Sequence, residues 1–375
     1  MAVEIVKVEG KALLREFITF PEKLYKDCPN FVPALIGDEF DTLDKKKNAA
    51  FDFCDADYFL ARKDGKTVGR VAAIINHNAN KSWNERTCRF GWMDFTEDLE
   101  VVKALIDAVI SWGRERGCNQ LKGPLGFTDM DKEGSLVEGY EHLSPFTCLY
   151  NYPYYDRLLK EVGFEKNVDW TQTVVEISSE LPPMFQYAPI VEKRFGLSIV
   201  NSKFKNMRDL GKKYGMSIFH MYNEAFAPLY QFSPLTDRQI KRYLQTYVPI
   251  LSKDFVPIVV DSEGNPVGFA FCVPSLSKAV KASGGRLFPF GFIRILRALK
   301  KNDTLEALMI GVLPEYQGKG ANVLMFKMLH ENCIKAGITK LILNPELEDN
   351  FKVQTLFSEY KTEPFMRRRS YTKQI

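Results

Sequence analysis

The chain repeats one order of secondary-structure elements, and this internal repeat restricts its fold more than any other feature. Asp57–Ile75 has the pattern of a strand, a tight turn at Asp64-Gly65 and a second strand. Asp254–Val273 has the same pattern, with its turn at Glu263–Asn265. Each predicted hairpin is followed by one long helical pattern and then by a short strand that ends at a proline. Two diverged copies of one α/β unit explain this order better than one large domain does.

The two copies differ in length after the hairpin. Their helices show apolar residues at spacings of three and four and end at glycine, Gly117 in the first copy and Gly337 in the second. The chain runs 48 residues from the Val-Gly pair at Gly69 to the first of these, and 69 residues from Gly268 to the second. The second copy therefore contains an insertion, at about residues 275–302.

A chain of 375 residues is expected to form two domains at about 150 residues each. The repeat predicts that they are residues 1–180 and 181–375, because Ser-Ser-Glu-Leu-Pro-Pro interrupts the pattern near Ser179–Pro189. Each is expected to hold a mixed, mainly antiparallel central sheet flanked by helices, which is an α/β (α+β) fold class.

Composition and charge exclude several kinds of protein. The 51 Lys and Arg nearly balance the 47 Asp and Glu, so nucleic acid is not an expected partner. No apolar run approaches the roughly 18 residues of a membrane span, and no secretory signal is visible. The seven cysteines and four histidines are scattered, which predicts reduced thiols in a cytoplasmic protein and no metal site.

One loop of the second copy is predicted to bind phosphate. Leu308–Phe326 reads as a strand that ends at Pro314, a glycine-containing loop, and a helix that begins near Ala321. The N–H groups at such a helix start have no intrahelical partner, and the helix dipole favours negative charge there. Gly318 and Gly320 would let the backbone approach a pyrophosphate closely.

The loop closely resembles a known motif. The sequence Val-x-Pro-Glu-Tyr-Gln-Gly-Lys-Gly, which ends at Gly320, resembles motif A of the GNAT superfamily of acyl-CoA N-acyltransferases, Arg/Gln-x-x-Gly-x-Gly/Ala. Gln317 fills the first position, whereas Asn322 stands where the pattern has Gly or Ala. The resemblance covers about residues 208–375. It implies that acetyl-CoA or another acyl-CoA is the co-substrate, with its pyrophosphate on the loop and its pantetheine arm along the strand. The implied cofactor-binding residues are Ile310, Gly311, Val312, Gln317, Gly318, Lys319, Gly320, Ala321 and Asn322.

The first copy resembles the same fold without this chemistry. Asn151–Phe164 resembles the family's Asn…Leu-Tyr-x-x-x-Gly-Phe helix. The position of the phosphate loop is occupied by Asp94–Glu100, whose carboxylates would repel a pyrophosphate and which contains no glycine. We therefore expect a tandem GNAT protein with a degenerate N-terminal copy, in which only the C-terminal copy binds CoA.

Acylation of an amine needs a base, an oxyanion donor and an acid for the leaving thiolate. Glu306 lies 11 residues before Gln317, on the strand that carries the base in the histone-acetyltransferase branch; a solvated or salt-bridged glutamate is the alternative. The backbone N–H near Val312 is the expected oxyanion donor. The family's acidic tyrosine falls on Phe357 here, so either Tyr360 or solvent is expected to supply the proton.

Several other residues are candidates by position. Asn344 and Asn350 would hydrogen-bond the pantetheine amides, or they are ordinary turn residues. The first helices of a GNAT domain usually wall the acceptor site, and core packing is the alternative there. The acceptor candidates in these helices are Tyr222, Asn223, Tyr230 and Phe232.

Two further segments of the chain are basic. Phe290–Lys301 is predicted to be an amphipathic, cationic helix that contacts a membrane surface or a long acyl chain, or else packs on its own domain. Arg367–Lys373 lies in the expected last strand, where it would receive an anionic substrate or RNA, or form a solvated strand face.

The sequence as a whole predicts an acyl-CoA-dependent N-acyltransferase, most simply an N-acetyltransferase, that acts on a small-molecule or amino-acid-like amine. Two alternatives remain: a non-catalytic acyl-CoA-binding protein, and an aminoacyl or peptidyl transferase of the tandem-GNAT type. The intact phosphate loop counts against the last, because such enzymes need no CoA pyrophosphate site.

Overall fold

The computed structural model describes residues 2–351 and 355–375, which form two compact units. Unit 1 contains the chain up to Thr171, Leu276–Ile295 and Met366–Ile375, and unit 2 contains Gln172–Ser275 and Leu296–Phe365. Residues 276–295 and 366–375, which the sequence-based division places in the C-terminal half, thus belong to unit 1. Three elements pass from one unit to the other: β7 (Glu165–Glu176), α10 (Gly291–Lys300) and β14 (Thr362–Gln374).

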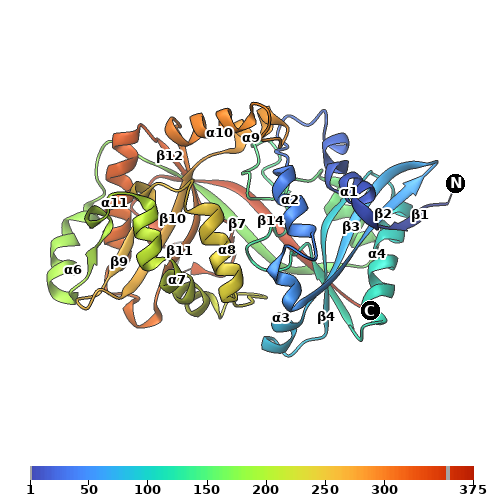
Figure 1. The fold of residues 1–375 in the computed structure, drawn as a ribbon, viewed down its shortest axis with the longest axis horizontal. Helices are drawn as coiled ribbons and strands as arrows, with labels where there is room; N and C mark the ends of the chain where they lie inside the picture. Colours follow the sequence, from blue (N-terminus) through green and yellow to red (C-terminus); the bar gives the residue numbers. More distant parts are fainter. Residues whose placement is uncertain (1, 352–354) are drawn as a thin grey trace. The chain divides into compact units, whose positions relative to one another are not determined.

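Unit 1 is built on one mainly antiparallel sheet (Figure 1). Only the β4–β5 pairing among those described in it is parallel. Its strands, in spatial order, are β1 (Glu4–Lys7), β2 (Cys54–Lys63), β3 (Lys66–Asn76), β4 (Thr87–Phe95), β5 (Gln120–Gly123) and β14, on which β6 (Ser135–Glu138) also pairs. Its helices are α1 (Gly10–Leu24), α2 (Ile36–Leu43), α3 (His77–Ser82), α4 (Leu99–Arg114), α5 (Tyr154–Glu161) and α9 (Ser277–Ser283).

Helices α1 and α4 cover opposite faces of this sheet, because successive residues of a strand point to opposite sides. On β2, Tyr58 and Leu60 share a core with Phe17 of α1. The alternate residues Phe59 and Ala61 share a core with α4. Alternate residues of β2 therefore pack against different helix layers.

Unit 2 has a sheet of the same kind (Figure 1). Its strands, in spatial order, are β7, β12 (Lys340–Ile342), β11 (Thr304–Val312), β10 (Pro266–Pro274), β9 (Ile258–Val260) and β8 (Ser198–Ile199). The β11–β12 pairing is parallel, and β13 (Glu346–Leu347) pairs with β7. The helices are α6 (Ala188–Phe195), α7 (Met207–Phe226), α8 (Asp237–Tyr247) and α11 (Ala321–Ala336), with short 3-10 turns η2 (Pro183–Tyr187), η3 (Asn201–Lys203), η4 (Lys253–Phe255), η5 (Pro314–Tyr316) and η6 (Thr355–Phe357). Unit 1 has one further 3-10 turn, η1 (Ala49–Asp52).

The same layering holds in unit 2. Ala270 and Cys272 of β10 share a core with α11. Phe271 packs against Phe219 of α7, with ring centroids 5.9 Å apart. Helix α6 packs on α11 and α8 on α7, so each face of the sheet is covered by two helices.

The repeat predicted from the sequence is confirmed by the order and direction of the elements. The segment β2-β3-β4-α4-β5 of unit 1 corresponds to β9-β10-β11-α11-β12 of unit 2, and the strands that flank the helix are parallel in both. Both third strands carry a bulge that the sequence did not reveal. In β11 the extra residue is Leu308, and in β4 it lies at Trp92–Met93, where Trp92 has a φ of 44°. The α/β fold class is likewise confirmed.

None of the described helices combines the length and apolar character that would be needed to cross a bilayer.

Candidate functional site

Strand β11 extends beyond its parallel neighbour, and this leaves part of its edge open. The β11–β12 pairing ends at Glu306 and Ile342, whereas β11 continues to Val312, still paired with β10 on its other edge. Leu308 and Ile310 of this extension are only half-buried. The bulge at Leu308 lies where the two strands part. An open strand edge offers N–H and C=O groups to an extended ligand, as an added strand would use them.

The open edge leads into a helix start with free N–H donors. Helix α11 begins at Ala321 after Gly320, which caps it without a side chain. The backbone N–H groups of Gly318, Gly320, Ala321 and Asn322 meet no acceptor within residues 2–351 and 355–375. Unpaired N–H groups at the positive end of a helix dipole form a site suited to an anion.

Side chains around the loop hold its shape. The Gln317 side-chain amide donates to the Val312 carbonyl at 3.3 Å, which ties the loop to the strand end. The Lys319 ammonium lies 4.8 Å from the centroid of the Tyr316 ring. The loop thus carries a cation next to the free N–H groups.

The two loop glycines have different structural roles. Gly318 and Gly320 have φ angles of 75° and 82°, in the left-handed region that favours glycine. A Cβ at Gly318 would meet nothing within 4 Å. A Cβ at Gly320 would lie 2.5 Å from Cγ2 of Val191 on α6. Glycine at position 320 is therefore required by the packing of α6 as well as by its φ angle.

In unit 1 the corresponding helix start is capped by the protein itself. Asp98 precedes α4, and its Oδ1 accepts from the Glu100 N–H at 3.0 Å. Its Oδ2 accepts from the Lys63 ammonium at 2.6 Å. Lys63 and the N–H groups of the helix start hold the pKa of the Asp98 carboxyl below its ordinary value. A carboxylate of this chain occupies the position that an anion would take.

The corresponding strand edge of unit 1 is filled as well. Phe95 at the end of β4 matches Val312, since each pairs with the hairpin glycine of its copy. The Phe95 N–H donates to the Tyr155 hydroxyl at 3.0 Å, and the Tyr154 hydroxyl donates to the Phe95 carbonyl at 2.6 Å. Two tyrosines thus satisfy both backbone groups of Phe95, whereas at Val312 the carbonyl accepts from Gln317.

Asp94 does not lie in the acidic loop to which the sequence assigned it. It is the penultimate residue of β4 and is buried, where it pairs with Arg70 at 2.7 Å. The Tyr25 hydroxyl donates to its other oxygen at 2.8 Å. Asp94 is therefore part of the interior of unit 1, and Asp98 alone supplies the helix-capping carboxylate.

Glu306 is the last residue of β11 that pairs with β12, directly beside the opening. Its side chain is buried, with 2% of its surface exposed, so it is not a solvated strand-start glutamate. The Ser275 hydroxyl donates to its Oε1 at 2.5 Å. The carboxylate is thereby held in one orientation at the base of the open edge.

Glu346 is a second carboxylate of unit 2 that the sequence analysis did not single out. Glu346 begins β13, four residues after Ile342, the β12 partner of Glu306. Burial raises the pKa of Glu346 to about 7. In the sequence it is one of three acidic residues in Pro-Glu-Leu-Glu-Asp-Asn, a pattern typical of a solvated turn, and no signal marks it as buried.

Tyr360 and Phe357 lie along α11, beyond the loop. Phe357 is buried and stacks on Phe326, with centroids 5.0 Å apart. The His330 Nε2 must donate to the Ser178 carbonyl at 3.0 Å, so its Nδ1 accepts from the Tyr360 hydroxyl at 3.3 Å. Burial raises the pKa of the Tyr360 hydroxyl, which makes it a weaker acid. The helix expected over 350–360 cannot be followed throughout, because residues 352–354 lie outside the described part.

The two asparagines lie in the turns after β12. Asn344 is exposed, and the Asn350 N–H donates to the Leu347 carbonyl at 2.9 Å. Both positions are compatible with ordinary turn roles.

The acceptor candidates lie mostly in the interior of unit 2. Tyr222 and Phe232 are both 2% exposed and pack edge to face, with centroids 5.5 Å apart. The Asn223 side chain exchanges two 2.8 Å hydrogen bonds with the Leu235 backbone, which fixes the loop after α7. Tyr230 is half-buried. Core packing accounts for Tyr222, Asn223 and Phe232.

The arginines of β14 do not form a solvated face. Arg367 and Arg369 each donate to the Asp169 carboxylate at 2.8 Å, and Arg368 is fully buried. Asp169 is itself buried, so the segment is a structural ion-pair network of unit 1.

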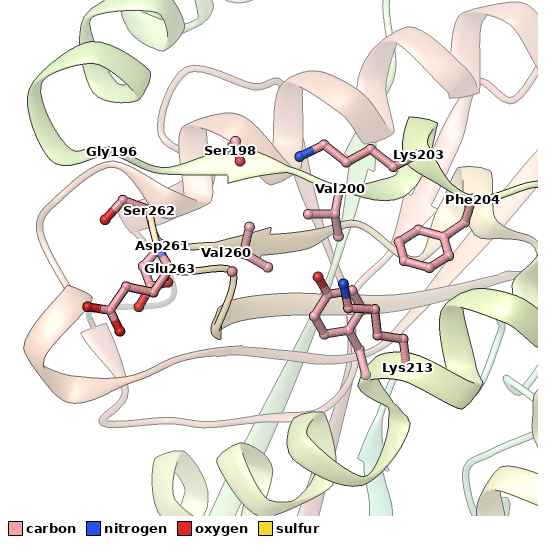
Figure 2. A pocket seen from close by; sticks show the side chains of 12 residues that line it. Gly196, Ser198, Val200, Lys203, Phe204, Lys213, Val260, Asp261, Ser262 and Glu263 are labelled. Carbon is pink, nitrogen blue, oxygen red and sulfur yellow. Dashed lines mark hydrogen bonds between the residues drawn. The ribbon is translucent and has the colours of Figure 1, made fainter.

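Unit 2 also contains a cavity of about 480 Å³ between β8, the β9–β10 turn and the start of α7. Figure 2 shows Lys203 and Lys213 on one side of it and Asp261, Ser262 and Glu263 on another. It contains none of the predicted site residues. Its mixed charge gives it no preference for an anion such as pyrophosphate.

No protein-family model matches the chain. Protein YghO from Escherichia coli K12 is 25% identical over 372 residues, 96% of this chain and 93% of that protein. A bacterial ceramide synthase from Caulobacter vibrioides is 23% identical over 367 residues, 95% of this chain and 93% of that protein.

Solved structures identify the fold. A tandem GNAT protein from the clavulanic acid biosynthesis pathway, without AcCoA, aligns with 99% of this chain and 98% of its own at a TM-score of 0.57 and 12% identity. The chain has the tandem GNAT fold. A GCN5-related N-acetyltransferase from Sphaerobacter thermophilus aligns over 99% of this chain and 95% of its own, at a TM-score of 0.52 and 11% identity. Unit 1 contains the N-terminal repeat, β2 to β5, and unit 2 contains the C-terminal repeat, β9 to β12.

Proposed function

We propose that this tandem GNAT protein is an acyl-CoA-dependent N-acyltransferase whose C-terminal copy binds the acyl-CoA. The observation that supports this most is the open edge of β11, which leads into the unpaired N–H groups of Gly318, Gly320, Ala321 and Asn322. A pantetheine arm has amide groups that can pair with a strand edge, and a pyrophosphate suits the helix start. Lys319 adds a positive charge beside the helix start, where the pyrophosphate would bind.

The N-terminal copy binds no CoA under this proposal. Asp98 caps its helix, and Tyr154 and Tyr155 take up the backbone groups of Phe95. A pyrophosphate there would face a carboxylate, and a pantetheine arm would have to displace two tyrosines. Unit 1 then binds no acyl-CoA itself.

The acceptor is proposed to be a small-molecule amine, and this class includes long-chain amines. The name of the Caulobacter relative supports acylation of nitrogen, since a ceramide is an amide of a fatty acid and a long-chain amine. The acyl group is then an acetyl or a longer chain, and the same strand edge serves both because it contacts only the pantetheine part.

Two carboxylates are candidates to take a proton from the acceptor's ammonium group, so that the neutral amine can attack. Glu306 is held by Ser275 at the base of the opening, and Glu346 has a pKa of about 7. A base with a pKa near the working pH is the most effective one. Backbone N–H groups at the Leu308 bulge and near Val312 would stabilise the oxyanion. Solvent, rather than Tyr360, protonates the thiolate, since the Tyr360 hydroxyl is engaged by His330.

The proposal is tested by thiol release from acetyl-CoA and from a long-chain acyl-CoA with a panel of amines. Wild type should release CoA only when an amine is present. Glu306→Gln and Glu346→Gln should be compared with Glu331→Gln, a control on α11. Loss of a positioned base typically costs about 10²–10⁴-fold in rate, so one of the first two variants should fall by that factor.

The results separate the alternatives. Acyl-CoA binding without amine-dependent release from any tested pair would favour the non-catalytic binding protein. Rates within threefold of wild type for both Glu variants would exclude both carboxylates as the base. Absence of acyl-CoA binding would refute the proposal itself.

A further inference from the structure

The insertion of the C-terminal copy presents an apolar surface that no part of the described chain covers. Five of the exposed large hydrophobic residues of the chain fall within ten positions, 287–296. Phe288 and Phe290 are 79% and 70% exposed, and Leu296 is 51% exposed. The aromatic patch, as we call it here, consists of Leu287, Phe288, Phe290, Phe292 and Leu296.

The patch is arranged by helix geometry on one side of α10. Phe292 and Leu296 lie one turn apart on α10. Phe288 lies in the turn before the helix, and its ring centroid is 5.9 Å from that of Phe292. Gly291 and Ile295, on the adjoining side of the helix, are buried. The helix therefore packs on the protein through one face and leaves its most aromatic face outside. This excludes the simplest reading of the sequence, in which the whole apolar face packs inward.

The segment before the patch is anchored within unit 1. The Gly285 carbonyl accepts from the Ile36 N–H at 3.0 Å, and Arg286 pairs with Glu22 at 2.8 Å. Lys281 donates to the Pro29 carbonyl, and a Cβ at Gly285 would overlap the Ala34 carbonyl oxygen at 2.1 Å. The phenylalanines are thus held outward by a fixed support rather than by a loose loop.

The charge around the patch has one sign. The stretch from Gly264 to Asn302 contains seven Lys or Arg and no Asp or Glu, in a chain whose net charge is only +4. Arg297, Lys300 and Lys301 are exposed at the C-terminal end of α10, next to the patch. Aromatic side chains beside exposed cations are complementary to the interface of an anionic lipid bilayer, where the rings enter the headgroup region and the cations meet phosphates.

We propose that the aromatic patch and its flanking cations dock this protein on an anionic membrane surface. With 10 residues, α10 is far too short to span a bilayer and lies in the plane of the interface. A membrane-bound enzyme would reach amphiphilic acceptors and long acyl chains in the lipid layer. The docking itself does not depend on the proposed acyltransfer.

The test is cosedimentation of the full chain with lipid vesicles, in the absence of acyl-CoA and amine. Wild type should bind vesicles that contain phosphatidylcholine and phosphatidylglycerol. Its partition coefficient should be at least tenfold lower with vesicles of phosphatidylcholine alone. Two variants probe the two components: Phe288→Ser/Phe290→Ser, and Arg297→Glu/Lys300→Glu/Lys301→Glu. Each should lower the partition coefficient at least tenfold, since one cation at an anionic surface contributes about fivefold.

Matched controls keep the outcome specific. Ile250→Ser removes an exposed apolar residue elsewhere, and Lys193→Glu/Lys335→Glu reverses charges outside the insertion; both should bind within twofold of wild type. All altered side chains are exposed, and circular dichroism confirms folding. No vesicle binding, equal binding to neutral vesicles, or unchanged binding of the patch variants would overturn the proposal. A concentration-dependent dimer that Phe288→Ser/Phe290→Ser abolishes would identify a second copy as the occupant instead.

Discussion

Replacing Gly320 by alanine should destabilise the C-terminal copy through one identifiable contact. The new Cβ would lie 2.5 Å from Cγ2 and 3.1 Å from Cγ1 of Val191, on the adjacent helix α6. The φ angle of 82° adds about 1–2 kcal/mol for a residue with a Cβ. Overlap in a packed region typically costs about 1–3 kcal/mol more. We therefore expect the free energy of unfolding to fall by about 2–5 kcal/mol.

The two contributions are separated by a double-mutant cycle with Val191→Ala. Val191→Ala removes both methyl groups that the new Cβ would meet, so Gly320→Ala in that background should retain only the backbone cost of about 1–2 kcal/mol. Gly318→Ala is the matched control, because its φ is 75° and its Cβ would meet nothing within 4 Å. It should cost about 1–2 kcal/mol in both backgrounds and show no coupling to Val191.

Urea unfolding followed by circular dichroism measures all six proteins of this scheme. The expected coupling free energy between Gly320 and Val191 is about 1–3 kcal/mol, well above the roughly 0.5 kcal/mol of independent sites. The reasoning would be refuted by equal costs of Gly320→Ala in both backgrounds. It would also be refuted if Gly320→Ala and Gly318→Ala were equally destabilising in the wild-type background.

Three further predictions follow from the contacts described above. Because burial raises the pKa of Glu346 to about 7 from an ordinary 4.5, the folded protein holds this proton more tightly than the unfolded chain, and stability falls as pH rises from about 4.5 to 7. The change in the free energy of unfolding caused by Glu346→Gln should therefore be more favourable at pH 8 than at pH 4, by up to about 3 kcal/mol in urea unfolding. The same change at both pH values would contradict this. Tyr360→Phe should leave turnover within threefold of wild type, whereas a tenfold loss with normal CoA binding would make Tyr360 the acid. Asp169→Asn should lower the stability of unit 1 by about 3 kcal/mol in thermal or urea unfolding, because it breaks a buried ion pair with Arg367 and Arg369; a change below 0.5 kcal/mol would show that the network contributes little.

The features that sequence analysis predicted correctly are those with short-range signals. The hairpin turn at Asp64-Gly65 and the start of α11 at Ala321 both follow from glycine, from period-two or helical spacing, and from positions within about 20 residues. The repeat could be recognised because the same local signals recur in the same order. The bulge at Leu308 could not be recognised from the sequence, since a bulge is defined by pairing with a distant strand.

The features that it missed depend on contacts between distant segments. Tyr154 and Tyr155 fill the strand edge at Phe95 from about 60 residues away, which no spacing reveals. Glu346 has an ordinary turn sequence, and only its burial changes its acidity. The repeat predicts Asp94 in the acidic segment that stands where the phosphate loop would be, yet strand β4 carries it into the interior beside Arg70. Burial of a charge is decided by tertiary packing, and composition contains little information about it.

The central claim is that one acyl-CoA binds per chain, on the open edge of β11 and the N–H groups that begin α11. Isothermal calorimetry with CoA on wild type, Lys319→Glu and the control Lys335→Glu tests it most directly, because both lysines lie at α11 but at opposite ends. The account predicts one site per chain, at least tenfold weaker binding for Lys319→Glu, and binding within twofold of wild type for Lys335→Glu. Two equivalent sites, no binding, or equal affinity of the two lysine variants would contradict it.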